Sequence, residues 1–371
     1  MRTAIIFLIL FFASNKTEAQ FIEKFKFWKE DTVKQKDGIF IFPLLYYTPD
    51  TRFAAGIVGV YYFNTGKIQD SEGPETRLSY VKLLGDYTQN RQLDLWSSWN
   101  IFTNQEKYLF KGEIRYRNFP DRFYGIGNNT PASQEEFYSY DLFNLKLLGM
   151  KQVYRNLFVG LDYQLTREYN FELEEGGILE TQDIIGARGG LGSAIGTVLT
   201  YDTRDNVVNA YSGMLFEAST YFYDDFLGSD FSFVNINLTY NKYWQIKKDH
   251  IIGFNSVVKL NYGGVPFLDM SKAGSSEILR GYAENRFRDH HFAGFQVEYR
   301  FPVWWRFGMV VFSGLGDVFR YPSDLQLNTL KYSFGAGIRF SVNPKERLNV
   351  RFDYGFGRNN NAFYIMLTEA F

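Results

Sequence analysis

Apolar and polar residues alternate with a period of two along most of the chain from Ile39 onward. Between residues 295 and 300, for example, Phe295, Val297 and Tyr299 alternate with polar side chains. Successive side chains of a β-strand point to opposite sides, so a strand with one apolar and one wet face produces this pattern. The alternation therefore predicts an all-β protein.

Turn residues divide the alternating region into sixteen predicted strands. An even number is typical of bacterial transmembrane barrels, and it places both ends of the barrel on the same, periplasmic side. A missed or split hairpin would change the count by two. The predicted strands are 39–47, 52–63, 77–88, 92–102, 107–118, 138–154, 157–169, 188–202, 213–223, 232–245, 250–262, 291–302, 305–319, 330–342, 347–356 and 363–371.

The lengths of the connections agree with this arrangement. The long connections follow odd-numbered strands, where the count places them outside the cell: 119–137, 170–187, 263–290 and 320–329. Short connections follow even-numbered strands on the periplasmic side. The exceptions are 64–76 and 203–212, which are long for periplasmic turns.

Composition distinguishes a membrane barrel from a soluble β-sandwich. The chain contains 38 Phe, 27 Tyr and 6 Trp, so that aromatic residues make up 19%. A soluble protein seldom carries so many, whereas a membrane barrel exposes them to lipid and at the two interfaces. The 40 basic and 41 acidic residues nearly cancel, which argues against a nucleic-acid partner. No Cys is present, which excludes disulfides, thiolate metal sites and Cys nucleophiles.

The N-terminal residues resemble a secretory signal peptide. Arg2 is followed by an apolar run from Ala4 to Ala13, which is too short to span a bilayer as a helix, and then by a small residue at Ala19. We therefore divide the chain into a signal peptide (1–19), a short periplasmic segment (20–38) and a transmembrane barrel (39–371). In the short segment Phe21, Phe25 and Trp28 recur at helical spacing, which predicts either an amphipathic helix or a polar linker.

Pro43 lies within the first predicted strand, where it cannot donate a ladder hydrogen bond. Two interpretations remain open at this stage. Either the strand is weakly paired, so that the seam between the first and last strands is the weakest ladder of the barrel, or a bulge surrounds the proline or the predicted start of the strand is misplaced.

No enzymatic site, cofactor site or metal site emerges from the sequence. The three His residues are His250, His290 and His291, and neighbours on a strand face opposite ways. Many Ser residues are present, but none stands in a local arrangement typical of a hydrolase. The Gly-rich run 186–196 lacks the strand–helix context of a dinucleotide site. We predict a protein that is not an enzyme.

The connection 263–290 is the most informative segment, since long ordered loops are uncommon unless they are functional. It contains Leu279, Arg280, Gly281 and Tyr282 in succession. If the loop folds inward, Arg280 can pair with the carboxylate of Glu298 on the polar face of the next strand. A solvated Arg280 in an outside loop is the alternative, and composition alone favours it.

These residues resemble motifs of the BamA/TamA-like surface antigen superfamily, whose sixteen-stranded barrels insert outer-membrane proteins or translocate polypeptides. Leu279 to Tyr282 is similar to the Arg-Gly-aromatic tip of its inward-folded sixth loop, and Glu298 to the strand residue that pairs with the tip. The segment Asp202, Arg204, Asp205 and Asn206 resembles a turn of the family. Residues 363–371, ending at Phe371, resemble its terminal strand, which serves as an assembly signal.

The chain departs from the family pattern in two respects. Gly314 stands where the family has an Asp that also holds the loop Arg, and Asp317 is an odd number of residues away, on the opposite face of a strand. Glu298 is then expected to be the only partner of Arg280. Residues 20–38 are also too few for the POTRA domains that members normally carry.

The resemblance implies a protein of the outer membrane that contacts its lipid, together with client outer-membrane proteins or accessory periplasmic proteins. The expected function is help in inserting or transporting polypeptides. The alternative is a passive or structural pore without insertase activity. The two departures favour the pore, whereas the retention of Arg280 and Glu298 favours the role in insertion or transport.

Overall fold

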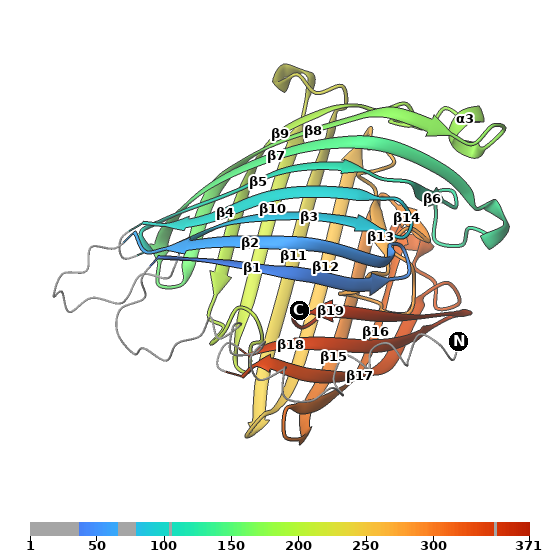
Figure 1. Cartoon of the computed structure of the whole chain (residues 1–371). Coiled ribbons are helices and arrows are strands. Elements are labelled where there is room, and N and C mark those ends of the chain that lie inside the picture. The colour runs from blue at the N-terminus through green and yellow to red at the C-terminus, as the bar shows by residue number, and fades with distance from the viewer. Residues whose placement is uncertain (1–36, 66–78, 104–105, 345–346) are drawn as a thin grey trace.

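The chain forms one closed antiparallel β-barrel of sixteen long strands in the part that the structure, a computed structural model, describes. The described residues are 37–65, 79–103, 106–344 and 347–371. The predicted signal peptide and most of the predicted short segment lie outside them. Figure 1 shows the strands wrapping around the barrel in chain order, from β1 in blue to β19 in red.

The strand boundaries follow the predicted ones within a few residues, except at the last strand. The barrel strands are β1 (Gly38–Thr48), β2 (Arg52–Phe63), β3 (Ser79–Thr88), β4 (Leu93–Phe102), β5 (Tyr108–Asn118), β7 (Glu136–Tyr154), β8 (Leu157–Leu173), β9 (Gly190–Asp202), β10 (Gly213–Tyr223), β11 (Phe233–Lys247), β12 (His250–Gly263), β15 (His291–Trp304), β16 (Phe307–Phe319), β17 (Lys331–Asn343), β18 (Leu348–Gly357) and β19 (Asn360–Leu367).

Short elements occupy the connections, where periodicity could not reveal them. Strand β6 (Asp121–Phe123) pairs with β7 beyond the end of β5, and β13 (Ser271–Ala273) pairs with β14 (Phe287–Asp289) inside the long loop. The helical turns are α3 (Ile178–Thr181), η2 (Ala132–Gln134), η3 (Asp225–Leu227) and η4 (Pro322–Asp324).

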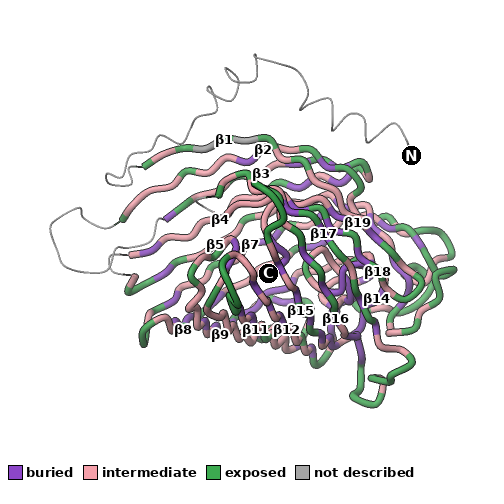
Figure 2. The backbone as a smooth tube through the Cα atoms, turned by 90° about the horizontal axis from the view of Figure 1, so that it is seen from below, coloured by how far each residue is buried: buried purple, intermediate pink, exposed green. Residues whose placement is uncertain are grey.

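The polar face of the strands is the buried one. In β15, Gln296, Glu298 and Arg300 are buried, whereas Phe295 is 46% exposed and Val297 is 43% exposed. The tube drawn in Figure 2 repeats this alternation of buried and exposed residues along the strands of the barrel wall. Apolar side chains on the outer face and polar ones in the lumen are the arrangement of a transmembrane barrel.

The seam between β1 and β19 is incompletely paired. All 11 residues of β1 oppose residues of β2, without a bulge at Pro43, which opposes Ile57. Along the described residues of the seam, by contrast, Tyr47 opposite Ile365 is the one ladder pair. The ring of Tyr47 also stacks on Phe363, with centroids 3.9 Å apart. The bulge interpretation is therefore wrong, and the seam is short.

No helix among the described residues is long and apolar enough to cross a bilayer. Nor do three or more His, Asp or Glu residues come together there in a group suited to a metal ion.

Candidate functional site

The connection between β12 and β15 (residues 264–290) carries its tip to the inner faces of five consecutive strands. At the tip, Leu279 adopts a φ of 53° and is completely buried among apolar side chains of the loop and of β15 and β16. The main-chain N–H of Gly281 donates to the Tyr364 hydroxyl of β19 at 3.0 Å. The Tyr282 hydroxyl donates to the carbonyl of Tyr332 on β17 at 3.1 Å.

Gly281 is required at this tip for two reasons. Its φ is 116°, a conformation that L side chains rarely adopt. A Cβ at this position would also lie 2.8 Å from the carbonyl carbon of Phe356 on β18, closer than real contacts allow. On the facing strand, a Cβ at Gly355 would lie 2.6 Å from the backbone of Arg280. Glycines on both sides therefore let the loop tip lie directly on β18.

Arg280 is completely buried between two carboxylates. Its guanidinium donates to Glu298 of β15 and, at 2.7 Å, to Asp353 of β18. Its Cζ lies 3.5 Å from the ring centroid of Phe312 on β16, so the cation also rests on an aromatic face. The structure therefore places Arg280 and Glu298 together inside the barrel, and not in solvent as the alternative required.

The position of the second carboxylate corrects the expectation that Glu298 alone would hold Arg280. Gly314 supplies no side chain, and a Cβ there would lie 3.0 Å from the Cβ of Gln296. Asp317 pairs instead with Lys331, at 2.9 Å, and does not contact Arg280. Asp353, two strands further on, takes the place of the missing acid, so the loop tip keeps two anchors.

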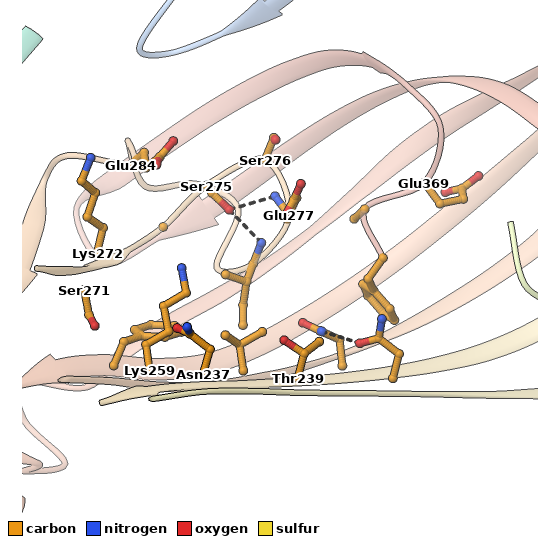
Figure 3. A pocket seen from close by; sticks show the side chains of 18 of the residues that line it. Asn237, Thr239, Lys259, Ser271, Lys272, Ser275, Ser276, Glu277, Glu284 and Glu369 are labelled. Atoms are coloured by element: carbon orange, nitrogen blue, oxygen red, sulfur yellow. Dashed lines mark hydrogen bonds between the residues drawn. The ribbon is translucent and has the colours of Figure 1, made fainter. Parts of the chain in front are cut away.

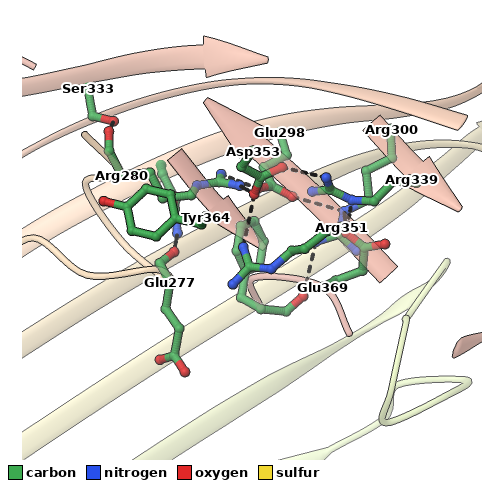
Figure 4. Close-up of polar contacts among 12 residues, drawn as sticks. Glu277, Arg280, Glu298, Arg300, Ser333, Arg339, Arg351, Asp353, Tyr364 and Glu369 are labelled. Atoms are coloured by element: carbon green, nitrogen blue, oxygen red, sulfur yellow. Dashed lines mark hydrogen bonds and ion pairs between the residues drawn. The ribbon is translucent and has the colours of Figure 1, made fainter. Parts of the chain in front are cut away.

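Arg280 is one member of a buried ion-pair network that crosses β15, β17, β18 and the last residues of the chain (Figure 4). Asp353 also pairs with Arg339 of β17 and, at 3.0 Å, with Arg351. Glu369 joins the network through Arg339, at 2.7 Å. The seven members are Arg280, Arg300, Arg339, Arg351, Glu298, Asp353 and Glu369.

Sequence reasoning missed five of these residues, although the alternation of apolar and polar residues marks four of them, Arg300, Arg339, Arg351 and Asp353. Arg351 and Asp353 alternate with Phe352 and Tyr354, which marks them as residues of a polar, lumen-facing side. That pattern does not reveal which lumenal charges meet, because the partners are brought together only by barrel closure.

The loop also reaches across the seam. The N–H of Glu284 donates to the carboxylate of Asp50 at 3.1 Å, in the turn between β1 and β2. On the other side of the seam, Tyr364 of β19 donates to the carbonyl of Tyr282 at 3.1 Å. The loop therefore links the end of β1 to β19, the two strands that share one ladder pair along the described seam.

Asp50 makes this link dependent on pH. Burial, with a smaller contribution from the nearby carboxylate of Glu284, raises the pKa of Asp50 from 3.8 to about 7. Because the folded-state pKa is raised, its stabilising contribution is present below the unfolded-state pKa and is lost as pH rises through about 7. We expect the wild type to lose stability between about pH 4 and 7 more steeply than Asp50→Asn, as measured by unfolding midpoints in denaturant. Asp183→Asn, at an exposed loop position, is the control. If stability falls equally steeply with pH in the wild type and in Asp50→Asn, the pH dependence does not arise from Asp50.

The predicted turn residues organise the connection 203–212 through their side chains. Asp202 pairs with Arg204 at 2.9 Å, and the Oδ1 of Asp205 accepts from the N–H groups of Tyr211 and Ser212. Asn206 accepts from the N–H groups of Val208 and Asn209. Asp205 also pairs with Arg347, at 2.6 Å. These contacts explain how a long connection stays ordered at this end of the barrel.

Phe371 is not on a strand, contrary to the predicted strand 363–371. Strand β19 ends at Leu367, and Thr368 adopts a φ of 73°, after which the chain turns inward. Arg300 donates to the main-chain oxygen of Phe371 at 3.0 Å, and the Phe371 ring stacks on Tyr243. Figure 2 shows this end of the chain inside the ring of strands. The role of Phe371 as an assembly signal remains a prediction.

Comparisons with known proteins agree with this architecture. Residues 151–371 match the model of the Omp85 superfamily domain. No curated protein matches the chain.

Similar solved structures include BamA from Haemophilus ducreyi lacking POTRA domains 1–3, with a TM-score of 0.58 and 12% identity over 90% of this chain and 71% of that one. CdiB from Acinetobacter baumannii has a TM-score of 0.56 and 10% identity, covering 90% of this chain and 60% of that one. CdiB from Escherichia coli has a TM-score of 0.58 and 8% identity, covering 90% and 67%. At these identities the structures show a common barrel fold, and the family match covers more than half of the chain. The chain belongs to the Omp85 superfamily.

Proposed function

We propose that this barrel assists the insertion or translocation of polypeptides at the outer membrane, through the seam between β1 and β19. The family and the fold support an outer-membrane barrel of the insertion and translocation type. The observation that carries the finer proposal is the single ladder pair, Tyr47 opposite Ile365, along the described seam.

The physical argument concerns unpaired backbone groups. Each interior strand of a closed sheet is paired on both sides, but β1 is fully paired only with β2. Its other edge presents N–H and C=O groups in the membrane, where leaving them unpaired is costly. An incoming strand that pairs with this edge satisfies those groups, which is the usual basis of β-strand addition. The client class is therefore an extended segment of another outer-membrane protein.

The loop tip fits this proposal as a restraint on the seam. Its contacts to Asp50 and Tyr364 hold the two edges near each other, while Glu298 and Asp353 fix its position inside the barrel. Such a restraint keeps the barrel sealed between insertion events without requiring a complete ladder.

Depletion of the protein, followed by profiling of outer-membrane proteins and secreted proteins, tests the proposal. We expect reduced levels of particular barrel proteins, restored by expression of the wild type. Unchanged barrel proteins and unchanged secretion would contradict a role in assembly or transport.

A passive pore is the second candidate, and the lumenal cavity favours it. The cavity measures about 990 Å³ and is lined by a mixture of amide, hydroxyl and charged side chains, several of which are labelled in Figure 3. Amides dominate the wall formed by β11 and β12, where Asn241 accepts from Asn255 at 2.7 Å. A conductance measurement on the protein in planar bilayers tests this candidate, which a completely tight barrel would contradict.

A further inference from the structure

The edge of β1 that faces the seam is longer than the part of β19 that lies beside it. In the antiparallel register of Tyr47 opposite Ile365, Leu367 at the end of β19 lies opposite Leu45. The following residues turn into the lumen, beginning with Thr368. Figure 1 shows β19 beside the half of β1 that leads to the turn into β2. Among the described residues, the first half of β1 therefore has no partner from β19.

Hydrogen bonds of the neighbouring ladder show which residues of β1 point their backbone groups to the seam. The N–H of Gln89 in β3 donates to the carbonyl of Phe53 in β2 at 2.7 Å, so the backbone groups of Phe53 point away from β1. Successive residues of an antiparallel strand point these groups to alternate neighbours. Ala54 therefore points to β1, where it opposes Tyr46. In this uninterrupted register, even-numbered residues of β1 bond to β2 and odd-numbered residues point to the seam.

The last strand gives the same result from the other side of the seam. The N–H of Thr368 donates to the carbonyl of Asn349 at 2.8 Å, so even-numbered residues of β19 point to β18 and odd-numbered residues point to the seam. Tyr47 and Ile365 are both odd-numbered, as a hydrogen-bonded pair across the seam requires. Two separate hydrogen bonds therefore assign the same backbone groups to the seam.

Pro43 occupies one of the seam-facing positions of β1. Ile39 and Ile41 each offer an N–H and a C=O there, whereas Pro43 offers only a C=O, and its ring lies where the hydrogen would be. The ladder to β2 loses no bond, because Pro43 does not point to it. Prolines on sheet edges limit pairing with further strands. Pro43 therefore divides the seam edge into two parts, residues 38–41, which we call the docking edge, and residues 45–47, which we call the closing edge.

We propose that Pro43 determines where a client strand pairs, by confining it to the docking edge and keeping it from the closing edge. This role rests on the proposed function, since it concerns the position of the client along β1. A strand added at the docking edge bonds to Ile39 and Ile41 and meets the proline at the next position. Pairing beyond the proline would place the client where β19 lies, at Leu45 and Tyr47, and would separate the two strands of the seam.

The side chains of the docking edge define the kind of segment that fits it. Ile39 is 65% exposed and Ile41 is 66% exposed, on the outer face of the barrel. Residues directly opposite each other in an antiparallel ladder point to the same face, so client residues opposite these two contact lipid and must be apolar. The client residues between them point to the lumen. The segment is therefore an extended strand with the period-two alternation of a transmembrane barrel strand.

Disulfide trapping of a peptide on the full chain in nonionic detergent tests this role. The chain has no Cys, so Ile41→Cys and Leu45→Cys each give a protein with one thiol. The probe is a synthetic peptide of residues 360–367, the strand that pairs with this edge in the structure, with Cys in place of Asn361. In the antiparallel register, a link to position 41 leaves the peptide on the docking edge, whereas a link to position 45 requires pairing across position 43.

The chain that keeps Pro43 is expected to give a linked product at position 41 and only background at position 45, measured as a mass shift on non-reducing gels. A peptide of the same composition with its alternation broken should give background at both positions.

Replacement of the proline provides the decisive comparison. Pro43→Val supplies the missing donor and removes no bond to β2, so we expect the product at position 45 to rise about tenfold, the scale of one net hydrogen bond. Pro302→Val is the matched control, because Pro302 is also an exposed strand proline but lies on β15, which does not border the seam. It should leave the products at both positions unchanged.

The outcomes separate this role of Pro43 from the proposed function. Equal products at positions 41 and 45 in the chain that keeps Pro43 would overturn the role, as would an unchanged product at position 45 in Pro43→Val, while strand addition at the docking edge would stand. Background at both positions in every variant would show that β1 adds no strand, which would contradict the proposed function and the role of Pro43 together.

Discussion

Replacement of Arg280 by glutamate is expected to destabilise the barrel by about 3–5 kcal/mol, the range for breaking a buried ion pair. The variant places a third carboxylate beside Glu298 and Asp353, which lie within ion-pair distance of Arg280 and are completely buried. The measurement is the temperature or denaturant concentration at which the folded, fast-migrating form disappears in gel electrophoresis.

A second substitution tests whether the pair itself is responsible. Addition of Glu298→Arg to Arg280→Glu restores one opposite-charge pair, but the new arginine also faces Arg300, whose Nε lies 2.9 Å from Glu298 in the wild type. We therefore expect partial restoration. Arg188→Glu, at an exposed loop position, is the control for charge reversal and should change stability by no more than about 0.5 kcal/mol. Additive effects of the two substitutions would refute the pairing.

A disulfide across the seam is expected to abolish assistance to client proteins while leaving the barrel folded. Tyr47 and Ile365 oppose each other, and directly opposed side chains on neighbouring strands are close enough for a cross-link. The chain has no Cys, so Tyr47→Cys with Ile365→Cys introduces only the intended bond. The measurement is the level of other barrel proteins in depleted cells that express the variant, with and without reductant.

The control joins the same strand to its other neighbour. Leu45 opposes Ala55 across β1 and β2, a ladder that is already complete. A disulfide from Leu45→Cys to Ala55→Cys should therefore leave assistance intact. Loss of function in both disulfide variants would indicate that rigidity of β1, and not closure of the seam, is responsible.

The sequence predicted the strands well because alternation is a local property of the chain. The same alternation gave a wrong end for the last strand, because Phe363, Ile365 and Leu367 continue to Phe371 at even spacing. The structure ends β19 at Leu367, since Thr368 takes a left-handed conformation and Glu369 turns to Arg339. The contact between Glu369 and Arg339 joins residues 30 positions apart, so no local pattern encodes it.

The candidate site was predictable only at its centre. The residues Leu279 to Tyr282 and Glu298 stand out by motif and by the length of their loop, and the structure brings Arg280 and Glu298 together. The pairing of Asp353 with Arg280 was out of reach, because the two residues lie 73 positions apart and meet only when the barrel closes. The absence of an acid at Gly314 suggested a weaker anchor, whereas a carboxylate on another strand restores it.

Assisted folding of a client protein in liposomes tests whether the seam between β1 and β19 takes part in insertion. An unfolded outer-membrane barrel protein is added to liposomes that contain the wild type, the variant with Tyr47→Cys and Ile365→Cys, or no protein. The folded fraction of the client is followed over time by its gel mobility. We expect faster client folding with the wild type, and folding with the oxidised Tyr47→Cys/Ile365→Cys variant no faster than in empty liposomes until reductant is added. Equal folding rates in all three preparations would contradict this role of the seam.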